Sequence, residues 1–222
     1  MTELLTAAQM RTIEQAAIDS SEVIGLELME RAGRGVVEAI FEEWPEYKTA
    51  PQSAAIFCGP GNNGGDGFVV ARLLRVLGWE VQVWLYGEVD NLPADARVNH
   101  NIWVTMGDVK PLDETEFRRG PNPAIYVDAI FGSGLSRPPE GDLANFLRYL
   151  GGAGGDRAHY QLRLVAIDAP SGLCLDSGRV LGRASQFALY NSIPLCRLTV
   201  TFDSPKTGHF LADGPESCGK LH

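Results

Sequence analysis

One segment of the sequence combines glycine, amide and carboxylate residues in a way that suits a charged small molecule. It spans residues 59–67, reads GPGNNGGDG, and follows a short apolar run. Glycines let the backbone approach a ligand closely, and the N-terminus of a following helix presents free N–H groups to an anion. We therefore expect a phosphate to bind here. The segment lacks the GK[ST] of a Walker A loop, and its GxGxxG-like spacing is a weak dinucleotide signature by itself.

Two aspartates stand near the ends of apolar runs. Asp128 lies within the run 124–131, which leads into GSGLSRP, and Asp168 ends the run 163–168, which leads into APSG. A buried carboxylate is costly unless it is paired, hydrogen-bonded or bound to a cation. Each aspartate also has a simpler interpretation, as an acceptor for nearby loop amides in the first case and as the cap of the following turn in the second.

Weaker candidates follow the last apolar run. Lys206 and His209, in the sequence PKTGH, could reach the same crevice, but an exposed surface turn explains them equally well. Cys58 precedes the glycine-rich segment with no histidine at a recognisable spacing. We interpret this cysteine as a core residue.

Strands that alternate with helices must position these groups. Apolar runs predict strands at 53–58, 80–86, 124–131, 163–168 and 197–202, and helical patterns occur at 6–20, 25–44, 68–77, 95–106 and 142–150. Thr6 and Gln9 form a capping-box pattern at the first helix. The alternation predicts an α/β fold with a mostly parallel sheet covered on both faces. In such sheets ligands bind at the carboxyl ends of the strands, which is where the segments above fall.

Composition narrows the class of protein. The 222 residues carry a net charge of −9, which disfavours binding to phosphate backbones. No linker divides the chain, so we expect a single domain over residues 1–222. The four cysteines form no CxxC pair, the start of the chain does not resemble a signal peptide, and no apolar run reaches the roughly 18 residues of a membrane span. These features predict a cytoplasmic protein.

The motifs together resemble the YjeF N-terminal domain family. They are LMERAG (28–33), GPGNNGGDG (59–67), VDAIFGSGL (127–135), IDAPSG (167–172) and LTVTFDSPKTGH (198–209), and the resemblance extends from about Leu5 to Gly219. It implies a Rossmann-like three-layer sandwich with two extra N-terminal helices. Enzymes of this family are NAD(P)H-hydrate epimerases, isomerases that interconvert the R and S forms of the hydrated cofactors NADHX and NADPHX.

The resemblance also implies roles for individual residues. A potassium ion would be held by Asn63, Asp128 and Ser171, and oxygen ligands suit such a hard cation. Asp168 would be the catalytic residue, acting as acid and base. The residues expected to contact the substrate are Asn62, Asn63, Gly64, Gly65, Asp66, Gly132, Ser133, Gly134, Leu135, Ser136, Arg137, Pro138 and Asp168.

The sequence departs from the family pattern in two places. Some members have a lysine after the second strand, but the segment 87–95 has none, so a second catalytic residue is not identified. The chain ends at 220–222, where a further apolar strand is expected, which suggests a piece of a longer protein. The family pattern further implies a homodimer built on the N-terminal helices, and an NAD(P)H-hydrate dehydratase, fused or separate, as functional partner.

Two other functions are compatible with the sequence. One is a non-catalytic nucleotide-binding or protein-interaction scaffold, since some domains of this kind are dimeric scaffolds. The intact Asp128 and Asp168 favour an enzyme instead. The other is a Rossmann-type methyltransferase or dehydrogenase, for which Glu88 or Asp90 only loosely supplies the acidic residue expected after the second strand.

Overall fold

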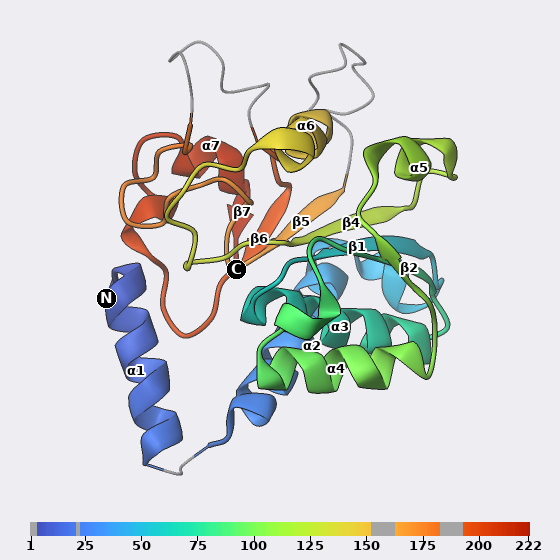
Figure 1. Cartoon of the computed structure of the whole chain (residues 1–222), viewed down its shortest axis with the longest axis horizontal. Helices are drawn as coiled ribbons and strands as arrows, with labels where there is room; N and C mark the ends of the chain where they lie inside the picture. Colours follow the sequence, from blue (N-terminus) through green and yellow to red (C-terminus); the bar gives the residue numbers. More distant parts are fainter. Residues whose placement is uncertain (1–3, 21–22, 152–162, 183–192) are drawn as a thin grey trace.

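The computed structural model describes residues 4–20, 23–151, 163–182 and 193–222 (Figure 1). Its centre is a seven-stranded sheet in the order β3-β2-β1-β4-β5-β6-β7, in which every pair of neighbours is parallel. The order reverses direction between β1 and β4, which creates a crevice at their carboxyl ends. The strands are β1 Ser53–Cys58, β2 Glu80–Leu85, β3 Val109–Pro111, β4 Ile125–Ala129, β5 Leu164–Ile167, β6 Leu198–Val200 and β7 Lys220–Leu221.

Helices cover both faces of this sheet, as predicted for a three-layer α/β sandwich. In Figure 1 the helices α2, α3 and α4 lie below the sheet, and α5 and α6 lie above it. The α-helices are α1 Ala7–Asp19, α2 Gly25–Glu43, α3 Asn62–Val76, α4 Ala94–Val104, α5 Glu114–Arg119, α6 Gly141–Leu150 and α7 Gly214–Cys218, and short 3-10 turns occur at Pro45–Lys48, Val89–Asn91 and Thr207–His209.

The N-terminal helix α1 stands apart from the two helical layers. It lies beside the C-terminal part of the chain rather than under the sheet (Figure 1). The predicted capping box is present, because Thr6 accepts a hydrogen bond from the Gln9 backbone and the Gln9 side chain accepts one from the Thr6 backbone. A parallel bridge between Leu5 and Lys206 joins the start of this helix to the segment after β6.

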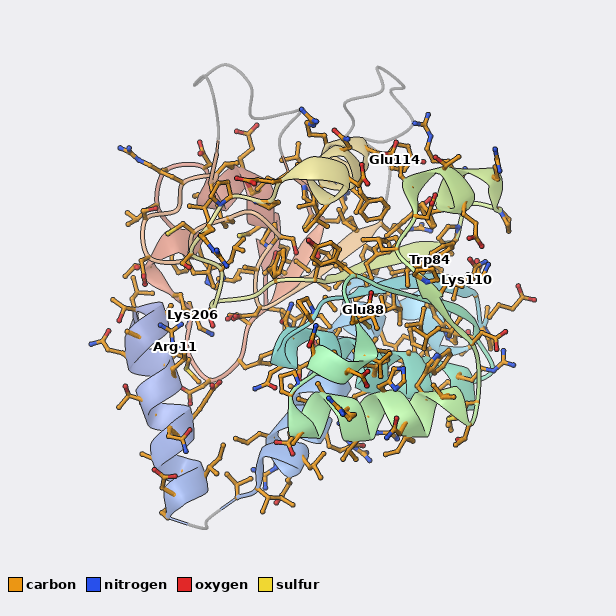
Figure 2. The ribbon with its side chains drawn as sticks, viewed as in Figure 1. Arg11, Trp84, Glu88, Lys110, Glu114 and Lys206 are labelled. Carbon is orange, nitrogen blue, oxygen red and sulfur yellow. The ribbon has the colours of Figure 1, made fainter. Side chains whose placement is uncertain are left out.

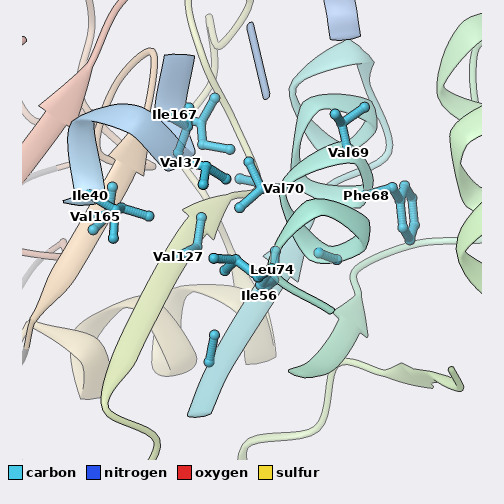
Figure 3. Close-up of a cluster of buried hydrophobic side chains, with 14 of the residues drawn as sticks. Val37, Ile40, Ile56, Phe68, Val69, Val70, Leu74, Val127, Val165 and Ile167 are labelled. Carbon is cyan, nitrogen blue, oxygen red and sulfur yellow. The ribbon is translucent and has the colours of Figure 1, made fainter. Parts of the chain in front are cut away.

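Each face of the sheet has its own apolar core. Below the sheet, side chains of α2 and α3 pack on strand residues such as Ile56, Val127 and Val165 (Figure 3). Above it, Phe57, Trp84, Phe117 and Phe146 form a cluster with several edge-to-face ring contacts. Burial on both faces explains why these strands are continuous apolar runs rather than alternating ones.

The structure corrects the predicted boundary of one helix. We expected residues 59–67 to be a loop and the helix to begin at Phe68, but α3 begins at Asn62. Glycine has low helix propensity, yet tertiary packing requires it here. A Cβ atom at Gly64 would lie 2.0 Å from the Gly59 carbonyl oxygen, and one at Gly67 would lie 2.7 Å from the Ala129 side chain. The glycines therefore allow the helix to approach the sheet closely.

Several short elements were not predicted. These are the edge strand β3 and the helices α5 and α7. A strand was expected at the end of the chain, and β7 lies there, with only two residues that pair with β6. Among the residues described, no helix combines the length and the apolar character needed to cross a bilayer.

Candidate active site at the carboxyl edge of the sheet

A cavity of about 400 Å³ opens where the strand order reverses. The loops after β1, β4, β5 and β6 form its walls, and α1 closes one side. Its lining residues are Met10, Arg11, Glu14, Pro60, Gly61, Asn62, Asn63, Asp66, Ile130, Phe131, Gly132, Ser133, Gly134, Leu135, Asp168, Phe202 and Lys206. The N-terminus of α3 lies in this wall, so backbone N–H groups are available to an anionic ligand.

Asp168 is held in this wall in an unusual backbone conformation. It directly follows β5 and has φ +64°, a value that non-glycine residues rarely adopt. Its backbone N–H donates to the Val200 carbonyl at 2.7 Å, which ties the turn to β6. Aspartate tolerates the left-handed region better than most residues. The turn directs the carboxylate toward the cavity.

Three donors saturate that carboxylate. Lys206 Nζ and Thr201 Oγ1 donate to Oδ1 at 3.0 and 3.1 Å, and the Ser133 N–H donates to Oδ2 at 2.7 Å. Burial acts to raise the pKa of Asp168, but the Lys206 charge and these hydrogen bonds outweigh it and hold the pKa below its usual range. Asp168 is therefore an ionised carboxylate at neutral pH.

Lys206 is buried rather than exposed. Its side chain is 2% exposed, and besides Asp168 it donates to Thr201 Oγ1 at 2.8 Å and to the Phe202 carbonyl at 3.1 Å. Figure 2 shows Lys206 next to Arg11 of α1, and both side chains line the cavity. The interpretation of the PKTGH segment as an exposed surface turn is therefore wrong. Lys206 therefore places a buried cation in the cavity wall.

Asp128 and Ser171 form a second buried pair, behind the cavity. Ser171 donates to Asp128 through its hydroxyl at 2.6 Å and through its backbone N–H at 2.7 Å, and the Ile130 N–H donates at 3.2 Å. Burial raises the pKa of Asp128 to about 6, against the lowering effect of these hydrogen bonds. The donors are all neutral, and within the described residues no cation pairs with Asp128. Loop amides account for its hydrogen bonds but leave its charge uncompensated.

Asn63 lies in the cavity wall, beside Gly132. A Cβ atom at Gly132 would lie 3.1 Å from Asn63 Oδ1 and 2.8 Å from Asp168 Oδ2, so the two side chains flank that glycine. The Asn63 Nδ2 group is buried and has no hydrogen-bond partner among the described residues. The adjacent Phe131 N–H donates to Ser171 Oγ at 2.9 Å.

The structure brings most, but not all, of the expected substrate-contacting residues to this cavity. Ser136, Arg137 and Pro138 instead line an adjoining cavity of about 410 Å³, which shares Phe131, Gly134 and Leu135 with the first. Gly64 and Gly65 are buried within α3 and are absent from both linings. The others, which line the first cavity, are Asn62, Asn63, Asp66, Gly132, Ser133, Gly134, Leu135 and Asp168.

Several lining residues were not predicted from the sequence. Met10, Arg11 and Glu14 come from one face of α1, and Arg11 Nη1 donates to the Ser133 carbonyl at 3.3 Å. These residues can be recognised as lining the cavity only once α1 is seen to lie beside the segment that follows β6. Lys206 carried a usable signal, since it follows a strand at the same edge of the sheet as Asp168.

Comparison with known proteins agrees with this architecture. A family model described as YjeF-related protein N-terminus matches residues 25–208. The chain belongs to this family. A curated relative from Rhodobacter capsulatus, named NAD(P)H-hydrate epimerase, is 47% identical over 94% of the chain and 92% of its own length. Another relative of the same name, from Roseobacter litoralis, is 40% identical over 100% of the chain and 97% of its own length.

Longer relatives and a solved structure extend the comparison. A protein of Moorella thermoacetica named bifunctional NAD(P)H-hydrate repair enzyme Nnr is 37% identical over 98% of the chain, which matches 39% of that protein. A crystal structure of the yeast protein ynu0 superposes with a TM-score of 0.73 at 23% identity, covering 95% of this chain and 85% of that one. The likeness to the yeast protein shows the shared fold.

Proposed function

We propose that this protein interconverts the R and S forms of hydrated NADH and NADPH. One observation carries the proposal. An ionised, fully hydrogen-bonded Asp168 faces a cavity at the strand-order reversal, beside the N-terminus of α3. Relatives similar over nearly the whole chain carry the name of this activity. A non-catalytic scaffold gives no reason to bury a Lys206–Asp168 ion pair against an open cavity, because such a pair is costly to desolvate.

The geometry suits the chemistry that this reaction requires. The hydrate carries a hydroxyl on C6, next to the ring nitrogen. Loss of this hydroxyl leaves an iminium-type cation stabilised by the nitrogen lone pair, and return of water to the other face inverts the centre. A fixed, buried carboxylate stabilises such a cation strongly. Asp168 is placed to do this, and the N-terminus of α3 is placed to bind a phosphate of the dinucleotide.

The residues Asn63, Asp128 and Ser171 fit the potassium ion that the family pattern implies. All three offer hard oxygen ligands. The uncompensated charge of Asp128 is the feature expected where a cation completes the site. When bound, the ion would supply the positive charge that Asp128 lacks and would fix the loops that carry Asn63 and Ser171.

Three further expectations belong to this proposal. The longer relatives support a functional link to a second repair activity, which we take to be an NAD(P)H-hydrate dehydratase, fused or separate. The exposed apolar side chains of α1 support a homodimer, since Ile13 is 45% and Ile18 37% exposed. The four cysteines are free, as in proteins of a reducing cytoplasm.

That residues 1–222 form one domain stays a prediction.

The direct test uses the R epimer of NADPHX in potassium buffer. Chromatography follows R-to-S conversion with the wild-type chain, with the Asp168→Asn variant and without protein. We expect acceleration by the wild type and a loss of about 10²–10⁴-fold in the variant. Asparagine tolerates the positive φ at this position, so circular dichroism should show an intact fold. A wild-type rate equal to the protein-free rate, or full activity in Asp168→Asn, would exclude the assignment.

A further inference from the structure

Two carboxyl groups line the cavity, and their hydrogen-bond partners differ sharply. Asp168 accepts from Lys206, Thr201 and the Ser133 backbone, as described above. Asp66, in α3, accepts no hydrogen bond and has no cationic partner in the part of the chain that the structure describes. Asp66, in the wall formed by α3, is therefore free to form a hydrogen bond with a ligand. Both oxygens of Asp168, in the wall after β5, already accept hydrogen bonds from the protein.

The charges that face Asp66 are all negative. They are Asp168 from the turn after β5 and Glu14 from α1, and the Cys58 thiol at the end of β1 is its other titratable neighbour. Burial, and after it these two carboxylates, raise the pKa of Asp66 well above its usual range. Glu14 is more exposed, and it faces Arg11, Lys206 and Asp203 besides Asp168. Arg11 and Lys206 line the same cavity, but neither lowers the pKa of Asp66, whereas Lys206 lowers the pKa of both other acids.

Departure of the C6 hydroxyl requires a proton donor. Asp168 is poorly suited to this task, because the Lys206 ammonium bonded to it at 3.0 Å keeps it ionised, without a proton to give. A carboxyl group with no protein partner is free to donate to a substrate oxygen. We propose that Asp66 is the general acid that protonates the departing hydroxyl, while Asp168 acts as the base. This inference rests on the proposed epimerase function and divides between two residues the acid and base roles first given to Asp168 alone.

With Asp66 as the acid and Asp168 as the base, every proton in the reaction is accounted for. The Asp66 carboxyl gives its proton to the hydroxyl oxygen, the C6–O bond breaks with release of water, and the ring-nitrogen lone pair forms the C=N bond of the cation. A water molecule then adds to C6 from the other face and gives its proton to the Asp168 carboxylate. Transfer of one proton from Asp168 back to Asp66, through solvent, restores the starting state. The Lys206 charge favours this return, since it stabilises ionised Asp168.

The test measures R-to-S conversion of NADPHX against pH for the wild type and for Asp66→Asn. We expect kcat to fall by about 10²–10⁴-fold in Asp66→Asn. Wild-type activity should also decline at high pH, where Asp66 loses its proton, and the residual activity of the variant should lack this decline. The matched control is Asp142→Asn, the same substitution at an exposed position in the first turn of α6, outside the cavity. This control should keep wild-type activity.

A binding measurement separates proton donation from substrate binding. NADPH, which lacks the C6 hydroxyl, should bind Asp66→Asn within about threefold of the wild type in calorimetry, because asparagine and a protonated aspartate are both neutral. Activity of Asp66→Asn within threefold of wild type would overturn the inference. So would a loss of NADPH affinity as large as the loss of kcat, or a high-pH decline abolished by Glu14→Gln instead. A wild type that does not accelerate conversion would contradict the proposed function itself.

Discussion

The imidazole of His209 donates through Nε2 to the backbone carbonyl of Asp168 at 2.9 Å and accepts through Nδ1 from the Lys206 N–H at 3.0 Å. The same short turn thus contacts Asp168 at both ends, since Lys206 Nζ bonds its carboxylate. His209 is 2% exposed, and its two bonds require a neutral ring protonated on Nε2. We interpret the turn as a clamp that keeps Asp168 in its left-handed backbone conformation.

Replacing His209 should weaken this clamp and should also reduce the pH dependence of the free energy of unfolding. His209→Leu leaves one buried carbonyl and one buried N–H unsatisfied, so we expect a loss of about 2–5 kcal/mol in the free energy of unfolding, from urea titration. His209→Gln retains an amide that can donate, and should recover part of this loss and of kcat. Wild-type stability and kcat in His209→Leu would contradict the clamp.

The pH dependence has a definite sign. Burial lowers the pKa of His209 below its ordinary value of 6.5, so the unfolded chain takes up this proton first as the pH falls. The contribution of His209 is therefore fully present above about pH 6.5 and is lost as the pH falls below it. Urea titrations at pH 7.5 and 5.5 should show a smaller decrease for His209→Leu than for the wild type. An equal decrease in the free energy of unfolding of the two proteins would show that His209 does not cause the loss of stability at low pH.

The Lys206–Asp168 pair should be strongly coupled. Removal of one partner from a buried ion pair costs about 3–5 kcal/mol, because the other charge stays buried without compensation. We therefore expect Lys206→Met to destabilise the protein by about that amount, and the double variant Lys206→Met/Asp168→Asn to be more stable than Lys206→Met alone. Urea titration of the wild type, both single variants and the double variant gives the coupling energy. Additive effects would show that the two residues do not interact energetically.

The sequence predicts the sheet well because burial leaves a strong signal. The strands β1, β4, β5 and β6 are runs packed on both faces, and β2 is buried over its second half. All five appear within a few residues of their predicted positions. Short elements such as β3 and β7 have too few residues to carry a pattern. The start of α3 was misplaced because its glycines oppose helix formation locally and are favoured only by close packing on neighbouring backbone.

The candidate site was predictable only where its residues share a motif. Asp168 and Asp66 lie in patterns visible in the sequence. The pairing of Lys206 with Asp168 was only partly predictable. The sequence shows that Lys206 follows a strand, but not that β5 and β6 are neighbours or that the turn after β6 folds inward. Arg11 and Glu14 depend in the same way on where α1 packs.

Close packing at the start of α3 predicts different effects for substitutions at two nearby glycines, Gly61 and Gly64. A Cβ atom at Gly64 would lie 2.0 Å from the Gly59 carbonyl oxygen, whereas one at Gly61 would meet nothing within 4 Å. Gly64→Ala should therefore lower the melting temperature by many degrees, because backbone must move to relieve the overlap. Gly61→Ala should leave it unchanged or slightly higher, since alanine restricts the unfolded chain. Similar melting temperatures for the two variants would contradict the packing at Gly64.

Potassium should stabilise the folded protein if Asn63, Asp128 and Ser171 hold the ion. A ligand that binds only the folded state raises its stability in proportion to the logarithm of ligand concentration. We expect a higher melting temperature in potassium chloride than in N-methylglucamine chloride of equal ionic strength. Asn63→Ala is the informative variant: Asn63 Nδ2 has no partner among the described residues, so truncation should cost little without potassium yet remove most of the potassium-dependent shift. Equal melting temperatures in both salts, or an unchanged shift in Asn63→Ala, would exclude the site.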